Sequence, residues 1–219
     1  MLNETRAPRQ DTSAMAEPCL DGAFIGGTVI ATALGWRAVE ALAPGDRVLT
    51  FDHGMVPLTD VIRGGYGYGD AVPAIGALRP LHVPAGAVSN ETAFDVLPGA
   101  YLMIESDLAE ELFGDPFVLL PARALEGFAG IAPAPVSGRP PSLVRLEFAE
   151  DEIVFLRSGG LHHCPKAGDF LQAVADTGHC GPTAALTLAE AREFLAMMDP
   201  SISGHCPDGP GAAVGVARA

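Results

Sequence analysis

The chain has 219 residues, a length that suits one domain of moderate size or one domain with an appended tail. Hydrophobic residues make up 48% of the sequence, which is too large a share for a chain that stays disordered. The formal net charge of −14 comes from 27 acidic residues against 13 basic ones, and this balance excludes nucleic acid and an anionic membrane surface as expected partners.

The first 18 residues (MLNETRAPRQDTSAMAEP) contain no apolar core of a Sec signal, and no stretch of the chain approaches the ~20 apolar residues that cross a bilayer. We therefore expect no membrane association and a cytoplasmic location, with export by a route other than Sec as the alternative. The cysteines are too few and too scattered for a disulfide scaffold, so we expect reduced thiols.

Short apolar runs bounded by turn residues dominate the chain and predict a mostly β fold. The sequence holds 26 Gly and 19 Pro, which interrupt helices and favour turns between short strands. The predicted strands lie at 28–33, 47–51, 58–62, 81–83, 94–97, 101–104, 117–120, 143–148 and 152–156. The last two flank Glu150 and Asp151 and predict a hairpin.

Three segments predict helices: 36–42, 105–114 and 187–198. The last begins with a capping box, Thr187 three residues before Glu190, and carries apolar residues at helical spacing. We expect residues 1–22 to form a flexible arm, 162–200 a loop followed by this helix, and 201–219 a disordered tail.

Three blocks of the chain resemble the bacterial branch of the Hint (Hedgehog/intein) domain family. GGTVIATALGWRAVEALAPGDRVLTFDHGMVPL (26–58) is similar to its opening block, DVLPGAYLMIESDLAEELFGDPFVLLPARAL (95–125) to its middle block, and LVRLEFAEDEIVFLRSGGL (143–161) to its closing hairpin. The resemblance implies a compact all-β domain over residues 23–161, whose two ends meet at one site.

The resemblance also implies self-cleavage chemistry, for which this chain lacks the residues. In the family, a Cys or Ser attacks the preceding carbonyl, and a His of the middle block protonates the leaving nitrogen. Here Ala23 takes the place of the nucleophile and Ala100 that of the His. Asp151 stands where relatives often carry a further His. We therefore predict a Hint fold without self-cleavage, retained as a binding or structural module.

Two other hypotheses stay open. Cys19, four residues before Ala23, is an alternative nucleophile for an active self-cleaving domain. A small metal-binding protein is the second alternative, with the candidate ligands His163, Cys164, Cys180 and Cys206. Their spacing includes no pair that fixes two ligands locally, so we expect neither a metal nor a cofactor. The sequence identifies no protein partner, although it leaves room for one.

Overall fold

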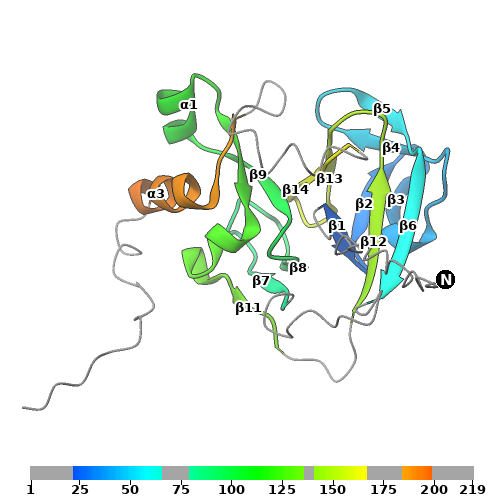
Figure 1. Ribbon diagram of the computed structural model, residues 1–219, viewed down its shortest axis with the longest axis horizontal. Coiled ribbons are helices and arrows are strands. Elements are labelled where there is room, and N and C mark those ends of the chain that lie inside the picture. The colour runs from blue at the N-terminus through cyan, green and yellow to red at the C-terminus, as the bar shows by residue number, and fades with distance from the viewer. Residues whose placement is uncertain (1–21, 66–78, 136–140, 167–183, 199–219) are drawn as a thin grey trace, which may run out of the picture.

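A computed structural model describes residues 22–65, 79–135, 141–166 and 184–198 of the protein. Strands dominate this part of the chain, and the two α-helices lie at one side (Figure 1). The two α-helices among the described residues are α1 (Asp107–Phe113) and α3 (Leu188–Met198). Short 3-10 helices are η1 (Val39–Ala41), η2 (Ala122–Leu125) and η3 (Phe128–Gly130).

The largest sheet has nine strands and runs through the whole domain. Its members are β2 (Val29–Thr32), β3 (Gly35–Ala38), β4 (Arg47–Thr50), β5 (Gly54–Pro57), β9 (Tyr101–Glu105), β10 (Phe117–Pro121), β13 (Glu152–Phe155), β14 (Leu161–Cys164) and β15 (Ala184–Ala185). The strand order is β15-β10-β9-β14-β13-β4-β2-β3, and β5 pairs with β4 outside this path.

Two smaller sheets have three strands each. The first has the order β1-β12-β6 and consists of β1 (Ala23–Ile25), β12 (Ser142–Glu147) and β6 (Asp60–Gly65). The second has the order β11-β7-β8 and consists of β11 (Ala132–Pro133), β7 (Leu81–Val83) and β8 (Phe94–Val96). The domain has two lobes (Figure 1). One contains the sheet of β1, β12 and β6, the other contains the sheet of β11, β7 and β8 together with α1 and α3, and β13 and β14 lie between them.

Each lobe has its own apolar core, and Phe94 packs against both cores. The core on the helical side includes Leu102, Leu120 and Phe194. Because the nine-stranded sheet continues from one lobe into the other, the two cores belong to one continuous structure.

All nine predicted strand regions contain a strand, and the helices predicted at 105–114 and 187–198 are α1 and α3. The Ser106 side chain accepts a hydrogen bond from the N–H of Leu108 and caps α1, and Gly114 ends this helix in a left-handed conformation. The capping box of α3 forms as predicted, because the N–H of Thr187 donates to Glu190 Oε2 at 2.8 Å. Fold class and mostly β composition are thus confirmed.

Three local predictions are wrong. Residues 36–42 form β3 and the short η1 instead of one helix, because β3 pairs with β2. The predicted hairpin of 143–148 and 152–156 does not exist: β12 pairs with β1 and β6, whereas β13 pairs with β14 and β4. The loop predicted to begin at residue 162 begins too early, because residues 162–164 belong to β14.

Among the described residues, no helix combines the length and the apolar character that a membrane crossing requires. Cys19, Cys180 and Cys206 lie outside the described residues, as do the predicted tail at 201–219 and all of the predicted arm except Gly22.

Candidate functional site

Ala23, which the sequence resemblance aligns with the family's nucleophile, lies at the start of β1 and is only 3% exposed. It pairs in register with Arg145 of β12, and its methyl group joins an apolar cluster with Leu97 and Leu143. An alanine side chain carries no atom that can attack a carbonyl. Position 23 is therefore a packed apolar site without a nucleophile.

The two ends of the described Hint-like region meet immediately before Ala23. Gly22 has φ = +72°, and a Cβ at this residue would lie 2.4 Å from Cδ of Pro165. Pro165 directly follows β14, so the beginning of β1 and the end of β14 are neighbours. This juxtaposition is the arrangement that the sequence resemblance implies.

Ala100, which the sequence resemblance aligns with the family's acid-catalytic His, is completely buried in the core of the helical side. Its N–H donates to the carbonyl of Leu97 at 3.0 Å, and its carbonyl accepts from the N–H of Ala122 at 2.7 Å. Leu97 thus connects the two positions: its side chain packs with Ala23, and its carbonyl binds Ala100. The structure brings both positions to one region and fills that region with apolar groups.

Asp151 lies in the turn between β12 and β13 and interacts with the end of β14. Its Oδ1 accepts a hydrogen bond from the N–H of Lys166 at 2.7 Å, and it lies 3.8 Å from Nε2 of His163. Asp151 therefore fixes the chain where it leaves β14, which is a structural contact.

The three polar residues of β14 alternate between its faces. The ring of His162 stacks on Phe24 with centroids 4.1 Å apart, and Cys164 joins the same core. His163 lies on the other face, with its ring 6.4 Å from that of Tyr101. Adjacent residues of a strand point to opposite faces, so His163 and Cys164 do not form a catalytic pair.

Burial decides the protonation of these groups. Desolvation, and secondly the nearby charge of His163, lower the pKa of His162 to about 3. Desolvation lowers the pKa of His163 as well, although Asp151 opposes this change. For Cys164, burial and then the charge of Glu152 raise the pKa of the thiol. Cys164 is therefore an un-ionised thiol, and a thiolate is the form that attacks a carbonyl.

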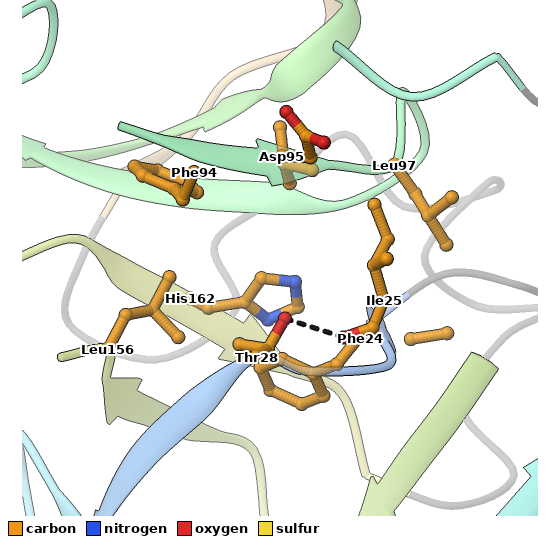
Figure 2. Close-up of a pocket in the computed structure, with 10 residues that line it drawn as sticks. Phe24, Ile25, Thr28, Phe94, Asp95, Leu97, Leu156 and His162 are labelled. Carbon is orange, nitrogen blue, oxygen red and sulfur yellow. Dashed lines mark hydrogen bonds between the residues drawn. The ribbon is translucent and has the colours of Figure 1, made fainter. Parts of the chain in front are cut away.

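A shallow cleft beside Ala23 is lined by residues of β1, β8 and β14, among them Phe24, Asp95 and His162 (Figure 2). Only ≈ 10 Å³ of it is open to the centre of a water molecule, which is room for about one water. Neither ring nitrogen of His162 has a hydrogen-bond partner. The hydroxyl of Thr28, also in the lining, donates to the carbonyl of Ile25 at 2.6 Å.

Within the part of the chain that the structure describes, no three His, Cys, Asp or Glu side chains form a group suited to a metal ion. Of the candidate metal ligands, His163 and Cys164 are placed on opposite faces of β14. The other two candidates, Cys180 and Cys206, lie outside the described residues.

One polar pair was not predicted. His53, in the turn between β4 and β5, has its Nδ1 3.2 Å from both carboxylate oxygens of Glu152, whose side chain is buried. This contact ties the turn to β13. No local signal in the sequence could have found a partner 99 residues away.

The mostly β architecture brings the start of the buried strand β1 beside the end of β14. The Hint domain family matches residues 22–159, and the chain belongs to this family. The match includes Ala23, Ala100 and Asp151, and it ends before β14 and α3.

Two solved structures are similar to this chain at low sequence identity. The bacterial intein-like domain from Clostridium thermocellum is 16% identical, with a TM-score of 0.43, and the alignment covers 64% of this chain and 97% of that one. A splicing-inactive, GSH-linked variant of the AceL NrdHF class 3 split intein is 15% identical, with a TM-score of 0.34, and the alignment covers 67% and 99% of the two chains. The comparison with curated proteins gave no match.

Proposed function

We propose that this chain is a Hint domain that does not cleave itself and that acts as a binding or structural module. The observation that carries the proposal is the apolar packing at the two positions where the family's chemistry takes place. Ala23 contacts Leu97 and Leu143, and Ala100 is fully buried in the neighbouring core. Nothing at these positions attacks a carbonyl or donates a proton.

The chemistry that is missing can be stated atom by atom. A thiol at position 23 would form a bond from sulfur to the carbonyl carbon of Gly22 while the C–N bond breaks and the nitrogen takes up a proton. The product would be a thioester and a free amine. An alanine at position 23 supplies no sulfur, and an alanine at position 100 supplies no proton for the nitrogen.

Other described groups do not replace the missing residues. Cys164 is buried in the core with Phe24, and burial raises the pKa of its thiol. Burial lowers the pKa of His162 to about 3. At neutral pH its ring is therefore neutral and carries no second proton to donate. These two residues support a packing role.

The test is the intact mass of the purified full-length chain, measured before and after incubation with dithiothreitol or hydroxylamine. Either nucleophile releases a chain that is held as a thioester, so a self-cleaving domain becomes shorter. We expect one unchanged mass. A loss of residues 1–18 would instead show chemistry at Cys19, and a Cys19→Ala variant that stays intact would confirm it. Such a result would overturn the proposal.

A further inference from the structure

The two α-helices of the described chain end in exposed apolar residues. Leu112 and Phe113, the last residues of α1, are 48% and 43% exposed, and Met197 and Met198, the last residues of α3, are 54% and 37% exposed. On both helices the apolar stripe that packs on the domain continues into these positions. Ala109 of α1 and Phe194 of α3 belong to the buried part of the same stripes.

Two contacts connect the helices near these exposed residues. The ring of Phe113 lies 6.2 Å from that of Phe194, and Oγ of Ser106 lies 3.9 Å from Sδ of Met198. The start of α1 therefore lies beside the end of α3, and the end of α1 lies beside the middle of α3. Both helices lie on the same side of the domain (Figure 1). We call the surface of Leu112, Phe113, Met197 and Met198 the helix-end patch.

The surroundings of the patch are acidic. Residues 105–115 contain no Lys or Arg, and their acidic residues are Glu105, Asp107, Glu110, Glu111 and Asp115. On α3, Glu190 and Glu193 outnumber Arg192. No ion pair within the described residues includes any of the carboxylates of 105–115. The patch is thus an apolar surface with an unneutralised negative border.

We propose that the helix-end patch binds a basic amphipathic helix of a partner protein. The apolar face of that helix would pack on the four side chains, and its Lys and Arg residues would face the carboxylates. Helix-on-surface recognition uses apolar anchors in this way, complementary charge speeds and directs the encounter, and methionine adapts its shape to a partner. The inference rests on the proposed binding role and specifies the class of partner.

Two other occupants fit the charges less well. A second copy of the chain would bring the same acidic border against itself, and like charges in contact oppose association. The chain's own residues 199–219 contain the acidic Asp199 and Asp208 against the single basic residue Arg218. Neither supplies the positive charge that the border of the patch requires.

The experiment measures fluorescence anisotropy of a fluorescein-labelled amphipathic peptide built from leucine and lysine, titrated with the full chain. A peptide with glutamate in place of lysine is the charge control. We expect the lysine peptide to bind, the glutamate peptide not to bind, and added salt to weaken binding because it screens the charges. The double variant Phe113→Ser/Met197→Ser should bind about tenfold more weakly or worse, as expected for the loss of two apolar anchors.

The matched control is the double variant Leu34→Ser/Trp36→Ser, which removes two exposed apolar side chains of the β2–β3 hairpin, far along the sheet from the helices. It should bind like the unmodified chain. Equal binding by both double variants would overturn the proposal.

Tighter binding after deletion of 199–219 would identify the tail as the occupant, and a concentration-dependent dimer lost in Phe113→Ser/Met197→Ser would identify a second copy. Both results would also overturn it.

The intact mass of the same samples separates this proposal from the proposed function. A chain that stays intact but does not bind the peptide contradicts only the docking proposal. A chain that shortens contradicts the absence of self-cleavage, whatever the peptide does.

Discussion

At the scale of single residues, Ala23 and Ala100, which the sequence resemblance aligns with the family's catalytic residues, are both part of the apolar core. Ala100 is completely buried, and both its backbone N–H and its carbonyl are hydrogen-bonded. There is no space around its methyl group that a larger side chain could enter without moving its neighbours. The packing therefore opposes the simple restoration of the family's His.

We predict that Ala100→His destabilises the fold. Overpacking a close-packed core costs about 1–3 kcal/mol, and a buried imidazole without hydrogen-bond partners adds to this cost. Urea denaturation should therefore show a lower midpoint for the variant. Ala132→His, on the exposed position of β11, is the control and should change the free energy of unfolding by about 0.5 kcal/mol or less. Equal midpoints for Ala100→His and the unmodified chain would contradict the prediction.

His162 gives the fold a dependence on acid. Its pKa is lowered to about 3 in the folded protein, mainly by burial, whereas a free imidazole titrates near 6.5. Above about pH 6.5 the ring is neutral in both states and has no effect. Between about pH 6.5 and pH 3 only the unfolded chain takes up the proton, so the free energy of unfolding falls as the pH falls.

The expected decline is about 1.4 kcal/mol per pH unit from this ring. His162→Phe keeps an aromatic ring against Phe24 and removes the titration. Urea denaturation at several pH values between about pH 7 and pH 4 should therefore give a shallower decline for the variant. His163, whose pKa is also lowered by burial, contributes to the slope that remains. Parallel declines for the two proteins would show that His162 does not cause the acid sensitivity.

At the scale of elements, β15 and α3 extend the domain beyond the residues that match the family. β15 pairs in parallel with β10, which would otherwise be the edge strand, and α3 covers the core of the helical side with Ala191, Phe194 and Leu195. The extension thus protects an edge of the nine-stranded sheet, since an uncovered edge can pair with another chain. It belongs to the domain physically, although it lies outside the family match.

We predict that Phe194→Ala lowers the free energy of unfolding by about 3–5 kcal/mol, because Phe194 is 1% exposed and its removal leaves a cavity. Met197→Ala, three residues further along α3, is the matched control. Met197 is exposed, so its truncation should cost about 0.5 kcal/mol or less. Chemical denaturation of both variants measures the difference. Similar losses in the two variants would mean that α3 does not pack through Phe194.

At the scale of the whole molecule, the two lobes depend on each other. One sheet passes through both lobes, and Phe94 packs against both cores. The contact between β13 and β14 at the centre includes His162, Cys164 and the buried Glu152. Neither lobe can unfold without breaking pairs that also hold the other lobe.

We therefore predict a single cooperative thermal transition, in which the calorimetric and van't Hoff enthalpies agree. Circular dichroism and the fluorescence of Trp36, in the lobe opposite the helices, should report the same midpoint. Two separate transitions would show that the lobes are independent folding units. Phe94→Ala should lower the midpoint of the single transition, because both cores lose a contact.

The sequence alone determined the features that depend on neighbouring residues. The apolar runs located the nine predicted strand regions, and Thr187 and Glu190 located the start of α3. These signals are local because a strand or a helix cap is specified by a few consecutive residues. The order of the blocks also indicated the family.

Only the tertiary structure decided which strands pair and which polar groups are buried. β12 and β13 are neighbours in sequence but join different sheets, and His53 contacts Glu152, which lies 99 residues away in the sequence. It also decided that His162 is buried with no partner for its ring and that α3 leaves Met197 exposed. Such contacts depend on how distant segments share one core, and the periodicity of a single segment carries no information about them.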